Sequence, residues 1–187
     1  MTKRTFIAIK INPTENLLYR IYYLKKHLSE DNINWIKIDH FHITLRFIGD
    51  TPIGSIESIS KSIEKVMLNY HSFDLNIKGI SVFGSHYKPK IIWAGVEPKE
   101  ILQKIAESID KELCALGFEI DRQNFVPHLT LGRIRKLKDK SHFFNVIEKP
   151  DSEVIQTETV KSVVFFESQL KQNGAVYNVL DQIQLKP

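Results

Sequence analysis

The sequence contains only one cysteine among its 187 residues, so the chain cannot form an intramolecular disulfide. That residue, Cys114, falls in a run with helical periodicity at residues 99–116, where a small buried side chain is expected rather than a nucleophile. Apolar segments of membrane-spanning length are missing too, and the short apolar run after Lys3 and Arg4 lacks the features of a signal peptide. From these absences we expect a cytoplasmic protein that does not enter a membrane.

Linkers rich in proline or serine are also missing, and hydrophobic (42%) and charged (26%) residues are as frequent as in ordinary globular proteins. A chain of this length buries a substantial core, either as one domain or as two small lobes that share an interface. We expect residues 1–187 to form a single domain and to be monomeric.

Two hydrophobic periodicities follow one another along the chain, one with the period of strands and one with that of helices. Strands are predicted at residues 5–11, 32–39, 41–48, 73–82, 91–96, 118–121, 125–134, 160–170 and 175–184. Helices are predicted at residues 13–28, 51–69, 99–116 and 141–147. Asn173 and Gly174 predict the tight turn of a terminal hairpin. The order of these elements indicates an α+β fold built from two similar halves.

One tetrapeptide occurs twice, as His-Ile-Thr-Leu at residues 42–45 and as His-Leu-Thr-Leu at residues 128–131. Both copies lie in predicted strands, where successive side chains point to opposite faces. His42 and Thr44 therefore share one face, as do His128 and Thr130, while the aliphatic residues point into a core. Two such strands can direct two histidines at one point.

Three kinds of chemistry could use two histidines. Zinc is commonly bound by histidine, but neither motif strand has a carboxylate two residues from its histidine. A threonine nucleophile activated by histidine would leave the repetition unexplained. Paired acid and base catalysis explains it, because opening a cyclic phosphodiester needs one group to accept a proton and another to donate one. Imidazole suits both tasks, since its ordinary pKa is about 6.5.

Hydroxyl and guanidinium groups near the histidines in the sequence are candidates to bind the phosphate. Thr44 and Thr130 can donate hydrogen bonds to phosphoryl oxygens, and Arg46 shares the face of Thr44 under strict alternation. The same alternation places Arg133 on the far face, unless the strand forms a bulge near Gly132.

Five basic residues lie directly at and after the end of the second motif, opposed only by an aspartate at position 139. They are Arg133, Arg135, Lys136, Lys138 and Lys140. A run of this kind is either a solvated loop or a surface that attracts phosphate, and its place beside the motif favours phosphate.

The sequence resembles the two-histidine phosphoesterase superfamily, and within it the RNA 2′,3′-cyclic phosphodiesterases, also called the 2′-5′ RNA ligase or LigT-like family. The resemblance spans nearly the whole chain. It rests on FIAI at residues 6–9, HITLRFIG at 42–49, Trp93, PHLTLGR at 127–133, FES at 166–168 and Tyr177.

The resemblance implies two pseudo-symmetric lobes, each an antiparallel sheet with helices on its outer face, and an active-site cleft between the sheets. It implies hydrolysis of a terminal RNA 2′,3′-cyclic phosphate to a 2′-phosphomonoester without a metal or cofactor. His42 would be the proton donor and His128 the proton acceptor. Thr44, Thr130 and Arg133 would hold the phosphate.

The chain departs from the family at Val126, where many members have a basic residue, and Arg122 is a candidate to replace it. Phe125 and Tyr87 are candidates for stacking on the terminal base. Three other functions stay open: hydrolysis of a small nucleotide such as ADP-ribose cyclic phosphate, RNA binding without catalysis, and 2′-5′ ligation.

Overall fold

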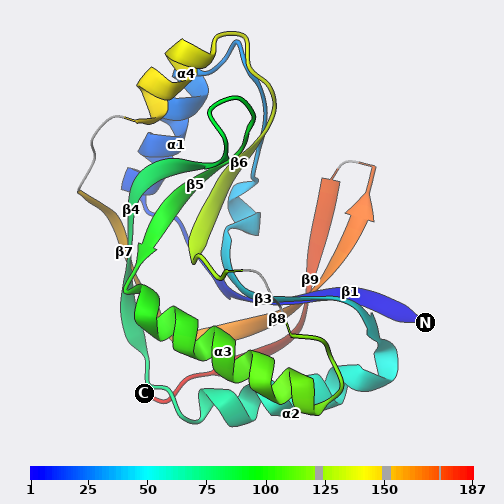
Figure 1. Ribbon diagram of the computed structural model, residues 1–187. Helices are drawn as coiled ribbons and strands as arrows, with labels where there is room; N and C mark the ends of the chain where they lie inside the picture. Colours follow the sequence, from blue (N-terminus) through cyan, green and yellow to red (C-terminus); the bar gives the residue numbers. More distant parts are fainter. Residues whose placement is uncertain (121–123, 149–152, 173) are drawn as a thin grey trace.

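The computed structural model describes residues 1–120, 124–148, 153–172 and 174–187 (Figure 1). The strands are Thr2–Lys10 (β1), Asn32–Trp35 (β2), His42–Pro52 (β3), Phe73–Gly84 (β4), Pro89–Glu97 (β5), His128–Lys136 (β6), Val154–Val160 (β7), Ser162–Lys171 (β8) and Gly174–Gln184 (β9). The helices are Glu15–His27 (α1), Ile56–Met67 (α2), Lys99–Ala115 (α3) and Lys140–Ile147 (α4), with 3-10 turns at Ile38–His40 (η1) and Ile53–Ser55 (η2). None of the helices within these ranges is long and apolar enough to cross a membrane.

The strands pair antiparallel in one curled sheet with the order β7-β4-β5-β6-β3-β1-β8-β9 (Figure 1). Strand β2 pairs with the end of β6, on the edge opposite β5 and beyond the contact with β3. The motif strands β3 and β6 are therefore neighbours at the centre of the sheet. Along this order three strands lie beyond each of them, and β2 is the additional strand on the side of β6.

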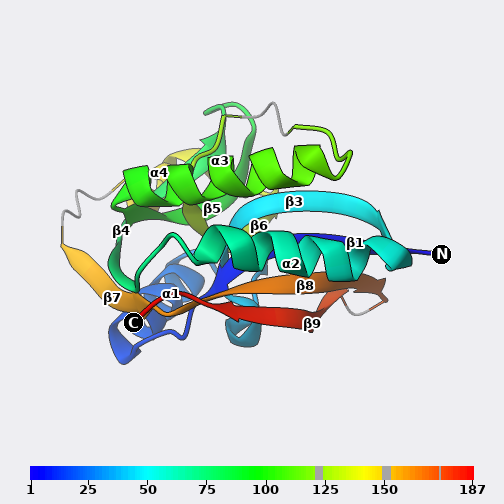
Figure 2. The same ribbon diagram turned by 90° about the horizontal axis from the view of Figure 1, so that it is seen from below.

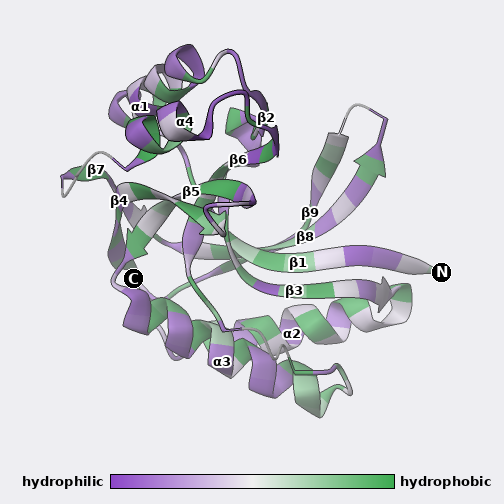
Figure 3. Cartoon of the chain, turned by 45° about the horizontal axis from the view of Figure 1, so that its top comes forward, coloured by the Kyte–Doolittle hydropathy of each residue, from purple (hydrophilic) through white to green (hydrophobic). Residues whose placement is uncertain are grey.

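The capping residues and the spacing of apolar residues in the sequence account for the helices. The side chain of Thr14 accepts a hydrogen bond from the backbone of Leu17 at the start of α1, and Asp139 caps α4 by accepting from His142. Helices α2 and α3 bury residues spaced three or four positions apart, such as Ile59 and Ile63 in α2. Figure 3 shows this amphipathic character as alternating hydrophobic and hydrophilic turns along both helices.

Two of the helices pack against the half of the sheet that does not contain the strand before them. Helix α1 follows β1 but contacts β7 and α4, whereas α3 follows β5 but contacts β3 and α2 (Figures 1 and 2). The two halves of the chain are thus interlocked, and one buried cluster includes residues of all four helices and of strands from both halves.

The predicted α+β class is confirmed, with antiparallel strands and helices outside them. The expectation of two separate sheets is wrong, because the motif strands lie side by side and join the halves in one sheet. A division into two lobes within this curled sheet stays a prediction.

Four details of the element prediction differ from the structure. No strand forms at residues 118–120, the described part of the strand predicted at 118–121. Strand β7 was not predicted. Helix α2 begins at Ile56 rather than at residue 51, because β3 continues to Pro52, which pairs with Thr2. The strand predicted at residues 32–39 ends at Trp35 and is followed by the turn η1. The terminal hairpin forms as predicted, although Asn173 lies outside the described residues.

Candidate active site

The two motifs meet where β3 pairs with β6. Ile43 is the antiparallel partner of Leu129, and both side chains are completely buried. Continued by one residue in each direction, this register brings His42 beside Thr130 and Thr44 beside His128. The four polar residues are partly exposed and alternate with buried neighbours, so they share the opposite face of the sheet.

Both motif histidines are held in the same way by the backbone. The Nδ1 atom of His42 lies 2.7 Å from the carbonyl oxygen of His40, and that of His128 lies 2.7 Å from the carbonyl oxygen of Val126. A carbonyl oxygen only accepts, so Nδ1 carries the proton and donates it in both rings. Each neutral imidazole therefore keeps Nε2 free to accept a proton, and each protonated ring can donate from Nε2.

Each imidazole lies against a stacked pair of aromatic rings. Phe6 and Phe166 stack with their centroids 5.1 Å apart, and His42 lies 5.0 Å from Phe6. Phe83 and Trp93 stack at 4.6 Å, and His128 meets Phe83 edge-on at 4.8 Å. These rings limit the movement of both histidines and exclude water from one side of each.

The surroundings lower the pKa of both imidazoles below the ordinary value. Burial is the main cause for His42, and the charges of His40, His128 and Arg133 lower its pKa further. Burial also dominates for His128, again with a contribution from Arg133. The carbonyl contacts at Nδ1 oppose these shifts, because they stabilise the protonated rings. The charge of Arg133 thus acts on the pKa of both histidines.

Tyr177 of β9 completes the surroundings of His42. Its ring lies edge-on to His42 at 5.3 Å and also contacts His40 at 4.7 Å. Burial raises the pKa of the Tyr177 phenol, while the charges of Arg133 and Arg4 lower it. In the sequence Tyr177 stands out only as a match to the family pattern. Its contact with the first histidine depends on the β8–β9 hairpin, which no local pattern reveals.

A β-bulge follows the threonine in each motif. In β3, Thr44 pairs with Ala8 and Arg46 pairs with Ile7, the neighbour of Ala8 in β1. Leu45 therefore has no partner of its own and is an extra residue. The same register shift occurs in β6, where Thr130 pairs with Trp93 and Gly132 pairs with Ile92, so Leu131 is the extra residue. An extra residue exchanges the faces of everything beyond it.

The bulge in β6 brings Arg133 to the face of the histidines, as the sequence suggested for a strand interrupted at Gly132. Arg133 borders the same cleft as Thr44 and His128. A side chain on Gly132 would be too close to β2, because its Cβ would lie 2.9 Å from Cγ2 of Ile33 and 3.1 Å from Cε3 of Trp35. Glycine thus permits both the bulge and the close packing of β2.

The bulge in β3 has the opposite effect on Arg46, so the expectation that Arg46 shares the face of Thr44 is wrong. Its Nε lies 2.6 Å from a carboxylate oxygen of Asp110 in α3. Its other nitrogens donate to the carbonyl oxygens of Phe47 and Glu119. The side chain borders the cleft and is only 8% exposed, so its guanidinium is already held by protein oxygens.

The cleft beside the second motif has a volume of about 960 Å³. It is bordered by residues of β3, β6 and α3 and by the segment that precedes β6, which includes Phe125 and Val126. Tyr87 lies on the β4–β5 turn with 88% of its surface exposed. Arg122, the candidate to replace a basic residue at Val126, lies outside the described residues.

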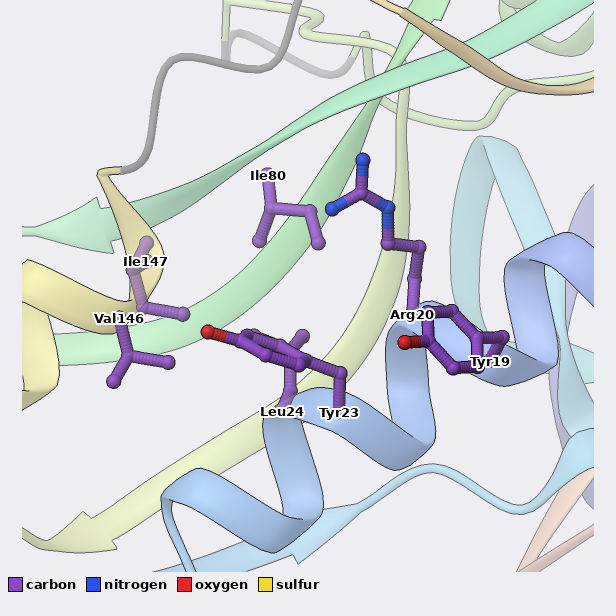
Figure 4. A pocket seen from close by; sticks show the side chains of 7 residues that line it. All are labelled: Tyr19, Arg20, Tyr23, Leu24, Ile80, Val146 and Ile147. Atoms are coloured by element: carbon purple, nitrogen blue, oxygen red, sulfur yellow. The ribbon is translucent and has the colours of Figure 1, made fainter.

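A second cavity, of about 210 Å³, lies between α1, β4 and α4 (Figure 4). Tyr19, Tyr23 and Arg20 border it from α1, while Ile80, Val146 and Ile147 lie opposite. None of the motif residues borders this cavity, so the motif cleft is the candidate active site. Within the described residues, no group of three or more His, Cys, Asp or Glu side chains is arranged to hold a metal ion.

Comparison with known proteins agrees with this arrangement. The family model described as the 2′-5′ RNA ligase superfamily matches residues 38–165. A protein of Thermotoga maritima named RNA 2′,3′-cyclic phosphodiesterase is 30% identical over 98% of this chain and 96% of its own length. A protein of the same name from Methanothermobacter thermautotrophicus is 25% identical over 99% of this chain and 100% of its own.

Solved structures share the fold. The apo structure of E. coli LigT superposes with a TM-score of 0.78, at 19% sequence identity, over 100% of this chain and 99% of LigT. The family match covers both motifs, and the similarity to the first relative extends over nearly the whole of both chains. The chain therefore belongs to the 2′-5′ RNA ligase superfamily.

Proposed function

We propose that the chain is a hydrolase that opens RNA 2′,3′-cyclic phosphodiester ends to 2′-phosphomonoesters by paired-histidine acid and base catalysis without a metal. The observation that carries this proposal is the matched pair of Nδ1 contacts, which leaves Nε2 of both His42 and His128 available on one face of neighbouring strands. The relatives named RNA 2′,3′-cyclic phosphodiesterase support the substrate class.

In the proposed reaction His128 begins neutral and His42 begins protonated. Nε2 of His128 accepts a proton from water while the water oxygen forms a bond to phosphorus. The bond between phosphorus and O3′ breaks, and Nε2 of His42 donates its proton to O3′. The product keeps its phosphate on O2′, and proton exchange with solvent restores both histidines.

Thr44, Thr130 and Arg133 act on the phosphate itself. The hydroxyls donate hydrogen bonds to the non-bridging oxygens, and the Arg133 guanidinium neutralises charge that grows as phosphorus becomes five-coordinate. The position of Arg133, which borders the same cleft as His128 and Thr44, supports this role. Arg46 is the weaker candidate for a phosphate contact, because Asp110 already pairs with it.

We also propose that residues 1–187 work as one domain. The exchange of α1 and α3 between the halves and the shared core support this, because neither half would keep its own packing if separated.

The test is hydrolysis of an oligonucleotide ending in a 2′,3′-cyclic phosphate, with and without EDTA, followed by identification of the product as the 2′-phosphomonoester. Equal rates with and without chelator are expected. Activity that EDTA abolishes and added metal restores would contradict the metal-free mechanism. Turnover of ADP-ribose cyclic phosphate but not of the oligonucleotide would favour a small-nucleotide enzyme, and tight binding without turnover would favour an RNA-binding module.

A further inference from the structure

Strand β6 continues beyond the cleft and carries a second arginine on the same face. Arg133 and Arg135 are both exposed, and Ile134 between them packs against the core, so both arginine side chains leave the sheet on the side away from the core. The pairing with β2 shifts here, because Ile33 pairs with Ile134 and Asn32 pairs with Lys136, which makes Arg135 an extra residue of β6. Two residues of a strand span about 6.6 Å, which is comparable to the separation of neighbouring phosphates along an RNA strand.

The two arginines differ from Lys138 and Lys140, two of the three lysines that follow them. Lys138 pairs with Glu30 at 2.7 Å, and Lys140 donates to the carbonyl oxygen of Tyr87 at 2.7 Å. In the described part of the chain, neither Arg133 nor Arg135 pairs with a carboxylate. Lys138 and Lys140 are therefore held by protein oxygens, whereas Arg133, Arg135 and the exposed Lys136 remain available to an anion.

The side of the cleft formed by α3 carries carboxylates. Gln103, Glu107 and Asp110 of α3 border it there, and the charge of Asp110 is compensated by Arg46 while Glu107 is exposed. A chain of phosphates leaving the motif histidines would be repelled over α3 and attracted over β6. The path along β6 is therefore the favourable one for a polyanion.

We propose that Arg135 binds the phosphate of the nucleotide that precedes the cyclic terminus, so that the RNA chain leaves the active site along β6. This assignment rests on the proposed function, in which Arg133 contacts the terminal phosphate. It makes the enzyme selective for oligonucleotides over nucleoside 2′,3′-cyclic phosphates, because a mononucleotide has no second phosphate for Arg135.

The experiment compares the wild type with Arg135→Gln on a nucleoside 2′,3′-cyclic phosphate and on an oligonucleotide with the same end. The KM of the oligonucleotide should rise about 5- to 10-fold, and the dependence of log KM on log salt should lose about 0.7 of its slope, the share of one phosphate of a single strand. Kinetics with the mononucleotide should not change. Lys138→Gln is the matched control from the same basic run, and it should behave as the wild type with both substrates.

Binding of an oligonucleotide that ends in a 2′-phosphate, measured by fluorescence anisotropy, gives a second readout that needs no turnover. Arg135→Gln should weaken this binding by a similar factor. A variant that affects both substrates equally, that affects neither, or that cannot be told from Lys138→Gln would overturn the role of Arg135. Failure of the wild type to hydrolyse either substrate would contradict the proposed function instead, and the binding measurement would still decide on Arg135.

Discussion

Ile43 and Leu129 face each other across β3 and β6, and each stands between the histidine and the threonine of its motif. Both are fully buried, so the core fixes the position of the pair. This contact fixes the positions of the catalytic residues proposed for the opposite face, because the histidine and the threonine flank the buried residue in each strand. One buried contact thus places the two copies of the tetrapeptide side by side.

Replacing either motif histidine should remove one proton transfer while leaving the fold intact. We expect His42→Ala and His128→Ala each to lower kcat by about 10²- to 10⁴-fold, the usual contribution of a general acid or base. Steady-state kinetics and circular dichroism check the two parts of this prediction. His71→Ala is the control, because His71 lies outside the motif strands and bonds to the carbonyl oxygen of Pro187. Full activity in a motif variant would exclude that histidine from the mechanism.

The pH dependence of the free enzyme follows from the lowered pKa of both histidines. His42 must be protonated and His128 neutral, and burial moves both ionisations below the ordinary imidazole value of about 6.5. The kcat/KM profile should therefore be bell-shaped with its maximum below about pH 6.5, and it should fall as the pH rises through neutrality. Bound phosphate raises the pKa of nearby imidazoles, so the profile of kcat should lie at higher pH. A maximum of kcat/KM well above pH 7 would contradict the assignment.

Arg133→Gln should have two effects that a purely structural residue would not combine. Loss of the guanidinium should lower kcat/KM by about 10²- to 10³-fold, as for other groups that stabilise developing charge. Because Arg133 lowers the pKa of both histidines, its removal should move both limbs of the kcat/KM profile to higher pH. Full pH profiles of the variant and of Lys138→Gln provide the comparison. An unshifted profile would mean that Arg133 lies outside the reacting site in solution.

Gly132→Ala tests whether the bulge and the packing of β2 depend on glycine. The added methyl would meet Ile33 and Trp35 at 3.1 Å or less, so β2 or β6 must shift. We expect a loss of about 1–3 kcal/mol in the free energy of unfolding, as for other overpacked positions, with reduced kcat/KM because Arg133 follows directly. Urea denaturation and kinetics measure the two effects. Gly54→Ala is the matched control, since nothing lies within 4 Å of a Cβ placed there.

The sequence predicted the faces of the motif residues but not those of the arginines beyond them. Alternation placed His42 and Thr44 on one face, and the structure agrees. The two bulges reverse this alternation after the threonines, and only Gly132 gave a sign of one of them. Nothing near Arg46 in the sequence indicated the other, and the partner of Arg46, Asp110, lies on a helix from the other half of the chain.

Strand β7 was missed for a related reason. Gln156 interrupts its apolar pattern, yet this side chain is only 3% exposed. Its amide accepts a hydrogen bond from the backbone of Thr14 and donates one to the carbonyl oxygen of Asn12. A buried polar residue whose hydrogen bonds go to a distant segment of the chain cannot be told from a loop residue in sequence.

Arg46 allows the predicted phosphate contact to be separated from a structural role. Arg46→Met should lower the free energy of unfolding by about 3–5 kcal/mol, because it leaves the largely buried carboxylate of Asp110 without its partner. The double variant Arg46→Met, Asp110→Leu replaces both charges by apolar groups, so most of the lost stability should return.

Activity then distinguishes the two roles, because the double variant restores packing without restoring a guanidinium. If Arg46 serves only to join β3 to α3 and to the carbonyl oxygen of Glu119, the double variant should regain kcat/KM along with stability. If Arg46 binds phosphate as the alternation of the sequence suggested, kcat/KM should stay low although the protein is stable. We expect kcat/KM to recover, because the guanidinium of Arg46 already donates its hydrogen bonds to protein oxygens. Urea denaturation and kinetics on the wild type, the single variant and the double variant measure the two effects.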